Sequence, residues 1–171
     1  LVPPPAPTLN AQTTSTKNAS VTITGTAMGA LSVEVSGPMG VFTVPVTNNN
    51  FTVDFVQHPL LDNRVNAIFF TSLSRCDGTR GPPRRTAITR DNQSPNLFID
   101  FPADGASITT SGTDVAGRVG DLLSGYQGLT VTVNGVTAGV NEGIGNNGTF
   151  FAANVPLNPN QSNTIQVTAT D

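Results

Sequence analysis

The sequence is poor in the residues on which most catalytic, metal and nucleic-acid chemistry depends. Its 171 residues include one cysteine, one histidine and no tryptophan, and charged residues make up only 11% of the chain. Because Cys76 is alone, an internal disulfide and a multi-cysteine metal site are both excluded. The formal net charge of −3, with eight Lys and Arg, argues against nucleic acid as the main partner, because neutralising phosphates requires clustered cations.

Long apolar runs are lacking as well. No stretch approaches the roughly 18 apolar residues of a membrane-spanning helix, and no signal-peptide core is present. No segment sustains the apolar spacing of an amphipathic helix. We therefore predict neither a membrane span nor a long helix. The chain starts at Leu1 without an initiating methionine, so we expect a piece of a longer or processed polypeptide.

The clearest positive pattern is the alternation of apolar residues with threonine over residues 129–133, which is typical of a half-buried strand. Asn134 and Gly135 follow, and both tolerate the positive φ that a two-residue type I′ turn requires. The pattern predicts an antiparallel hairpin that returns through residues 136–138.

The same alternation predicts strands elsewhere. They are expected at residues 8–9, 21–26, 31–36, 41–46, 51–55, 65–71, 86–89, 97–99, 113–119, 147–157 and 163–168. The strands at 31–36 and 41–46 form a second hairpin, with Pro45 at an open edge because it has no amide proton for a ladder. Phe51, Val53 and Phe55 are expected to face the core.

Proline and glycine mark the connections. The proline-rich residues 1–7 are expected to act as a semi-rigid spacer. Residues 76–78 and 81–83 carry turn signals, and residues 91–95 form a short linker.

The predicted strands fall into two similar sets. Landmarks of the first set recur in the same order about 97 to 99 residues later, which indicates a two-copy tandem repeat. Short strands at this spacing, without helices, imply β-sandwich units. We predict one domain over residues 1–91 and a second over residues 92–171.

Several specific motifs occur in the second set of predicted strands. They are Leu97-Phe98-Ile99 after Pro95, Pro102-Ala103-Asp104-Gly105, Val131-Thr132-Val133-Asn134-Gly135, Val155-Pro156-Leu157 and the ending over residues 163–171. They resemble the Ig-like modules related to domain B of glucodextranases. The first set matches more loosely, through residues 5–9, 21–26 and 66–68. Together the sets resemble the tandem bacterial Ig-like domains of large surface and secreted proteins.

The resemblance implies an all-β fold of two tandem Ig-like or fibronectin III-like β-sandwiches at an extracellular or cell-surface location. Modules of this type usually add one more strand after an ending like residues 168–171, so the second sandwich is expected to lack its last strand. Either that strand lies in a tail outside this sequence, or an adjacent chain or domain adds it by β-addition. Some related modules bind calcium near the domain junction, but Ser74 replaces the acidic residue of this motif in the first set, which weakens that inference.

Two groups of residues are candidate binding sites. The calcium candidates are Asp91, Asp100, Asp104 and Asp171, whose carboxylates could approach the ends of the second sandwich. Calcium needs six to eight oxygen ligands, and no D-x-D-x-D-G loop is present to supply them. The alternative interpretation is that these aspartates form turns. The second group is a cluster of arginines in one neighbourhood of the sequence: Arg75, Arg80, Arg84, Arg85 and Arg90. These side chains could bind an anionic glycan or an acidic surface through bidentate pairing, or they could belong to a solvated loop.

Signals for catalysis and sugar binding are weak. His58 has no second histidine for a metal pair, no nucleophile-elbow motif is present, and we expect His58 in a surface loop. Residues 143–148 fit G-x-G-x-x-G but no helix is expected to follow, so a hairpin loop is predicted instead of a nucleotide site. Sugar stacking favours exposed Trp and Tyr; Tyr126 is the only one, and the nine Phe are interpreted mainly as core.

These observations favour a non-catalytic structural, spacer or adhesion segment of a larger bacterial-type surface or secreted protein. Its partners would be neighbouring domains or identical subunits, with a glycan as a further possibility and calcium as the only cofactor considered. One alternative is a subunit of an extracellular filament assembled by β-strand addition between chains. Another is an accessory module of a polysaccharide-active enzyme.

Overall fold

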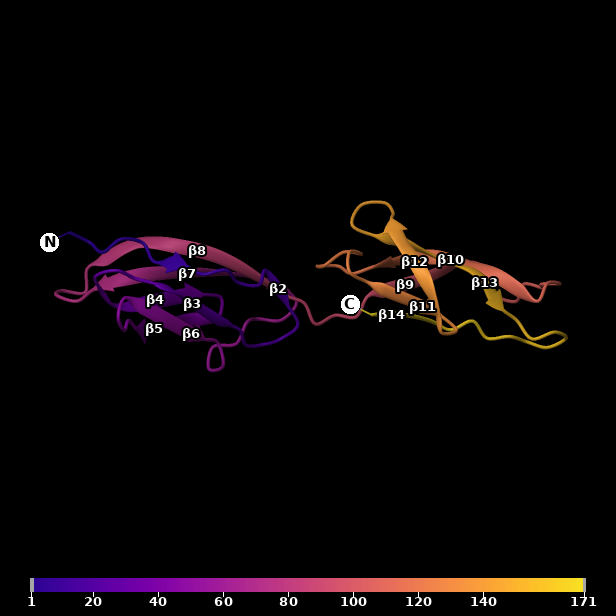
Figure 1. Cartoon of the computed structure of the whole chain (residues 1–171), viewed down its shortest axis with the longest axis horizontal. Coiled ribbons are helices and arrows are strands. Elements are labelled where there is room, and N and C mark those ends of the chain that lie inside the picture. The colour runs from indigo at the N-terminus through magenta and orange to yellow at the C-terminus, as the bar shows by residue number, and fades with distance from the viewer. Residues whose placement is uncertain (1, 171) are drawn as a thin grey trace. The chain divides into compact units, whose positions relative to one another are not determined.

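The computed structural model describes residues 2–170, and within them β-strands are the only regular secondary structure besides turns (Figure 1). The all-β prediction is confirmed. The chain divides into two compact units, Leu1–Asn92 and Gln93–Asp171. No helix long and apolar enough to cross a membrane occurs in the described part of the chain.

The first unit contains two sheets. The smaller has the order β1 (Thr8–Leu9), β3 (Thr22–Thr26), β6 (Asn50–Asp54). The larger has the order β2 (Ser15–Thr16), β8 (Arg80–Arg90), β7 (Arg64–Ser74), β4 (Ala30–Gly37), β5 (Gly40–Pro45). Pairing is antiparallel except between β2 and β8. Pro45 ends the edge strand β5, as predicted, where its missing amide proton interrupts no central ladder.

Alternate residues from both sheets build the core of the first unit. Phe51, Val53 and Phe55 are buried as predicted, and they belong to a cluster with Ile23, Val33, Val35, Ile68, Phe70 and Ile88. An apolar layer contributed by both sheets is the arrangement of a β-sandwich.

Two predictions for the first unit are wrong. Residues 81–83 are part of β8 and do not form a turn; the two prolines fit because the β7–β8 register shifts between Thr71 and Leu73. The proline-rich lead-in is packed and not free, since Pro4 and Pro7 are buried. A Cβ on Gly81 would lie 2.2 Å from the Pro4 carbonyl oxygen, so only glycine permits this approach of the two segments.

The second unit is one six-stranded sheet that folds over its own core. Its order is β14 (Val167–Thr170), β11 (Thr130–Val133), β12 (Val136–Glu142), β13 (Gly148–Pro156), β10 (Gly112–Gly120), β9 (Asn96–Phe101). The first part of β12 pairs with β11 and the part from Gly139 onward pairs with β13. One strand therefore joins the two sides of the fold, around a core that includes Val115, Val131, Val133 and Phe150.

The Asn-Gly hairpin is confirmed. Asn134 and Gly135 have φ values of 48° and 82°, and Val133 pairs with Val136 across the turn. Two positive φ angles in a two-residue loop define the type I′ geometry whose twist matches the flanking strands.

The two units share their strand register. Val35 pairs with Phe70 in the first unit, and Val133 pairs with Val167 in the second. The predicted hairpin strands also pair with each other in both units, from Ser32 with Pro45 in the first and from Val131 with Ala138 in the second.

The spacing between equivalent residues is not uniform, which corrects the expected offset of 97 to 99. Gly25 and Gly117 are equivalent, because a Cβ on either would collide with a carbonyl oxygen of the first strand and with the ring of Phe51 or Phe150. They lie 92 residues apart, whereas Phe51 and Phe150 lie 99 apart. The second unit therefore gains residues between these two points, and most of the gain lies between β10 and β11, where residues 121–129 replace the short connection of residues 27–29 between β3 and β4.

Candidate functional site

The five arginine candidates do not form one patch. Four of them lie on β8, which at about 3.3 Å per residue separates Arg80 from Arg90 by about 33 Å. Arg84 and Arg85 are exposed, and as neighbours in a strand they point to opposite faces. The remaining candidate, Arg75, is exposed in the turn between β7 and β8.

Two of these arginines have structural partners. Arg80 forms a bidentate pair with Glu34 of β4, including a 2.9 Å bond from one guanidinium nitrogen to Oε2. Arg90 donates a 2.9 Å bond to the Leu60 carbonyl and lies 3.6 Å from an oxygen of Asp62. These two side chains connect β8 to neighbouring segments, whereas Arg75, Arg84 and Arg85 are exposed and dispersed.

The calcium candidates are dispersed too. Asp91 is buried in the first unit, where its amide donates a 3.0 Å bond to the Thr16 carbonyl. Asp104 is exposed in the turn after β9, and Asp171 lies outside the described residues. Within residues 2–170, no group of three or more His, Cys, Asp or Glu side chains is placed to hold a metal ion.

Asp100, the remaining candidate, has a cation as its partner. Arg118 on β10 donates bonds of 2.9 Å and 2.8 Å to its two carboxylate oxygens. These bonds hold the pKa of the Asp100 carboxyl below its usual range and raise the pKa of Arg118. The guanidinium carbon also lies 5.3 Å from the centre of the Phe98 ring. The carboxylate is neutralised within its own sheet.

The lone histidine and cysteine have no catalytic surroundings. His58 is half-buried and stacks on Phe42, with ring centres 4.0 Å apart and planes 4° apart. It packs on the first unit and is not a freely exposed loop residue. Cys76 is exposed in the β7–β8 turn, next to the side chain of Asp77 and its partner Thr79. Residues 143–148 connect β12 to β13, as the hairpin-loop prediction required.

The interpretation of phenylalanine as mainly core is wrong for the second unit. Phe98, Phe101 and Phe151 are 58%, 52% and 48% exposed. Arg118 pairs with Phe98, and Ala116 pairs with both Phe101 and Phe151, on the side of the sheet opposite to the buried Val115. Alternation alone does not tell which face of a strand is buried, so this exposed aromatic surface had no sequence signal.

The first unit has threonine where the second has phenylalanine. Thr8 pairs with Thr26 at the position of the Phe98–Arg118 pair, and Thr52 follows Phe51 as Phe151 follows Phe150. Since the same fold forms with threonine at these positions, it does not require the exposed rings.

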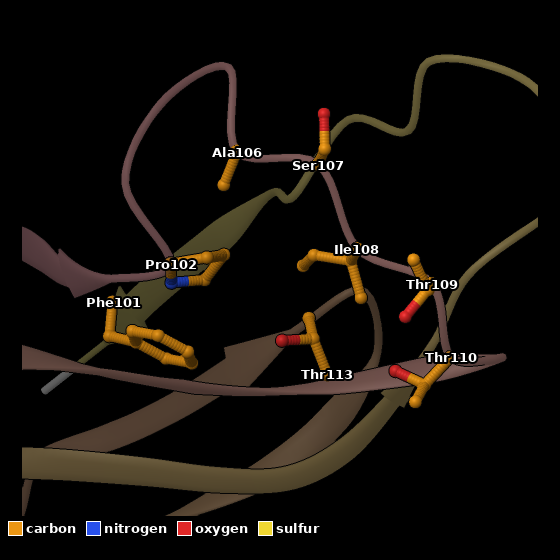
Figure 2. A pocket seen from close by; sticks show the side chains of 8 residues that line it. All are labelled: Phe101, Pro102, Ala106, Ser107, Ile108, Thr109, Thr110 and Thr113. Carbon is orange, nitrogen blue, oxygen red and sulfur yellow. The ribbon is translucent and has the colours of Figure 1, made fainter.

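An open pocket of 380 Å³ lies in the second unit between the end of β9 and the start of β10. Figure 2 shows Phe101, Ile108 and Thr113 facing this space from three different segments. The complete lining is Phe101, Pro102, Ala106, Ser107, Ile108, Thr109, Thr110 and Thr113. The lining contains no charged group.

β14 and β9 are the two outermost strands in the sheet of the second unit. β14 pairs with β11 and has no second strand partner among the described residues. β9 is the other edge of the same sheet, and it approaches β14 without a ladder between them.

Comparisons with known proteins give little further guidance. The chain matches no protein-family model and no curated protein. It is similar to a solved structure of a protein from Corynebacterium diphtheriae that is provisionally classed as membrane anchored, with 12% sequence identity and a TM-score of 0.41. The similarity covers 96% of this chain and 49% of that protein, so this chain spans about half its length.

Proposed function

We propose that this chain is a non-catalytic segment of an extracellular or cell-surface protein, in which two tandem Ig-like β-sandwich domains act as a spacer or adhesion segment. The main support for the proposal is that the same set of hydrogen bonds occurs in both units and in each joins segments of that unit alone. Nothing in the described residues gathers the acids, bases or metal ligands that catalysis requires.

The repeated feature is an asparagine side chain that bonds to the corner preceding the strand that pairs with the hairpin, β7 in the first unit and β14 in the second. In the first unit Asn66 accepts a bond from the Leu61 amide and donates to the carbonyls of Leu61 and Arg64, at 2.8, 2.9 and 3.2 Å. In the second unit Asn163 makes the same three bonds with Asn158 and Gln161, at 2.7, 2.9 and 3.1 Å.

A backbone hydrogen bond also recurs in both units. The Leu60 amide donates to the Ala19 carbonyl at 2.8 Å, and the Leu157 amide donates to the Ser111 carbonyl at 2.9 Å. In each unit this bond joins the segment that follows β6 or β13 to the segment that precedes β3 or β10, and both partners belong to the same unit. Independent closure is what a segment assembled from repeated modules needs, because each module must stay folded beside its neighbour.

Force spectroscopy on single molecules tests the spacer role. The chain is held by its two ends and stretched, and two separate unfolding events are expected. Their length gains should be about 33 nm for residues 1–92 and about 28 nm for residues 93–171, at about 3.6 Å per extended residue. A single event, or extension at the force of an unstructured chain, would contradict the proposal.

The exposed phenylalanines favour a second candidate function, that of an accessory module binding a neutral polysaccharide. Aromatic faces attract the weakly positive C–H groups of sugar rings, and the Asp100–Arg118 pair adds no net charge. The variants Phe98→Thr and Phe151→Thr replace each phenylalanine by the threonine that stands at the equivalent position of the first unit. If the protein binds a neutral glucan, its migration in a gel containing the glucan should be slowed, and these variants should migrate normally. Equal migration of the unchanged protein with and without the glucan would rule out this candidate function.

A further inference from the structure

The outward side of the sheet in the second unit carries an apolar row beside a polar row. Strands β12, β13, β10 and β9 are neighbours in this order, so side chains that are register partners line up across them. The apolar row is Gly139, Phe151, Ala116 and Phe101. The adjacent row, polar except for its last member, is Asn141, Thr149, Arg118 and Phe98. Together the two rows form the aromatic face.

Two phenylalanine rings stand above a low floor on the aromatic face. The Phe151 ring is 48% exposed and has only Gly139 and Ala116 beside it in its row. A Cβ on Gly139 would meet nothing nearer than an oxygen at 3.9 Å, so the space beside the ring is open. Phe98, which is 58% exposed, lies two strands away and one row along. At about 4.8 Å between strands and about 3.3 Å per residue, the two phenylalanines are about 12 Å apart.

Hydrogen-bonding side chains lie between and beside the two rings. Arg118 is the register partner of both Phe98 and Thr149. Its side chain is 61% exposed although it is paired with Asp100. Thr149 and Asn141 are exposed in the same row. The aromatic face therefore offers a guanidinium, a carboxylate, a hydroxyl and an amide to a ligand that lies across the rings.

The charge of this surface selects against ionic partners. The charged residues on the outward side of β9, β10, β12 and β13 are Arg118, Asp100 and Asp114, and their charges of +1, −1 and −1 sum to −1. Because Arg118 is neutralised by its bidentate pair with Asp100, these four strands present no unpaired cation to a carboxylate or sulfate group. An anionic polymer would be repelled, whereas a neutral polymer would not.

The size of the aromatic face favours a narrow ligand over a folded protein. Three rings that are 58%, 52% and 48% exposed offer about 300 Å², at about 150–250 Å² for a whole aromatic side chain. A stable protein complex needs about 800 Å² per partner. A peptide is disfavoured as well, because β10 and β13 have a paired strand on each side, so their backbone groups are already bonded. A ligand on this surface must bond to side chains alone.

We propose that the aromatic face binds a neutral β-1,4-linked glycan in an extended conformation. The chain runs from Phe98 to Phe151, and its sugar rings stack on these two phenylalanines. Its hydroxyl groups bond to Arg118, Thr149 and Asn141. Because both rings belong to one sheet, a chain that contacts both must stay straight over about 12 Å, which is more than one sugar residue. A β-1,4-linked chain is straight over this span, whereas an α-1,4-linked chain curves away. The site rests on glycan binding, the second candidate function, and does not depend on the spacer role.

The test is an NMR titration of the isotope-labelled 171-residue chain with cellohexaose and with maltohexaose. Both probes are neutral hexamers of glucose, and they differ only in the linkage. Cellohexaose should shift the amide signals of Phe98, Thr149 and Phe151, and maltohexaose should leave them in place. Cellobiose is too short to contact both rings and should bind about tenfold more weakly than cellohexaose.

Three variants assign the binding to the aromatic face. Phe98→Thr and Phe151→Thr each remove one ring and should weaken cellohexaose binding by about three- to tenfold. The matched control is Phe69→Thr, which removes a ring that is 37% exposed on the first unit and should leave the affinity unchanged. A higher salt concentration should leave the affinity unchanged as well, because the proposed ligand carries no charge.

Each contrary result has a distinct meaning. Unchanged cellohexaose affinity in both Phe98→Thr and Phe151→Thr overturns the site. Binding of maltohexaose but not of cellohexaose overturns the extended chain and leaves glycan binding standing, whereas binding of neither hexamer removes glycan binding as well. Shifts of the same amides when the protein is concentrated without sugar would show that a second copy covers the aromatic face, which also overturns the proposal.

Discussion

Asn66 and Asn163 make the same three local bonds in different surroundings, so replacing each by alanine separates the effect of burial from that of hydrogen bonding. Asn66 is completely buried and adds a bond to the Ile88 carbonyl. Asn163 is half-buried, and its partner Asn158 is exposed. Water can replace the lost bonds at the second corner but not at the first.

The magnitudes follow from this difference. Asn66→Ala leaves the half-buried amide and carbonyl of Leu61 without the partner that the fully buried Asn66 provides, which should lower the free energy of unfolding of the first unit by about 3 kcal/mol. Asn163→Ala exposes its partners to water and should cost the second unit about 1 kcal/mol. At a urea dependence of about 1 kcal/mol per molar for units of this size, the midpoints shift by about 3 M and 1 M.

The chain offers a separate signal for each unit. Tyr126 is the only tyrosine, tryptophan is absent, and its ring packs on the core of the second unit, so tyrosine fluorescence reports that unit alone. Circular dichroism reports both. Asn66→Ala should shift the dichroism transition and leave the fluorescence transition in place, and Asn163→Ala should shift the fluorescence transition.

The control is Asn10→Ala, which removes one exposed 2.8 Å bond to the Thr24 hydroxyl and should change stability by less than about 0.5 kcal/mol. Equal shifts for Asn66→Ala and Asn163→Ala would show that burial does not set the cost. A shift of the fluorescence transition by Asn66→Ala would refute independent closure of the two units.

Three further changes test other parts of the structure. Gly117→Ala should destabilise the second unit by about 3 kcal/mol, because its Cβ would lie 2.0 Å from the Phe98 carbonyl oxygen, whereas Gly139→Ala, with nothing nearer than 3.9 Å, should be neutral in the same fluorescence-detected urea titration. Gly135→Ala should cost about 1 kcal/mol through its φ of 82°, and an unchanged midpoint would contradict the type I′ turn. Asp100→Asn should lower stability at pH 7, and the difference should shrink as the pH is lowered: the folded pKa of Asp100 is depressed, so the stabilisation by the pair is fully present above the unfolded pKa near 4 and is lost as pH falls through the folded pKa.

Local sequence patterns were sufficient for most strands of both units. The alternation at residues 129–133 and the Asn-Gly pair define the hairpin without help from distant residues, because the turn geometry and the period of two are both local properties. The strand predicted at residues 65–71 is part of β7, the central strand of the larger sheet of the first unit. In each of these cases the residues that show the sequence pattern are the same residues that form the strand or turn.

Predictions failed where a distant segment decides the outcome. Residues 81–83 read as a turn, yet they extend β8 because a register shift on β7 and the lead-in at Pro4 make room for them. The aspartates and arginines read as candidate sites, yet Asp100 finds Arg118 and Arg80 finds Glu34 on neighbouring strands. Register between strands places these partners together, and no local pattern records it.

The exposed phenylalanines mark the limit of reasoning from alternation most clearly. In a strand, residues of one parity share a face, so the pattern at residues 148–152 fixes that Phe150 and Phe151 point to opposite sides. Which side is buried depends on what packs against the sheet. The equivalent pair in the first unit, Phe51 and Thr52, needs only one apolar residue to fill its core. The first unit folds with threonine at this position, and an exposed aromatic patch such as that of the second unit is typical of a surface that contacts another molecule.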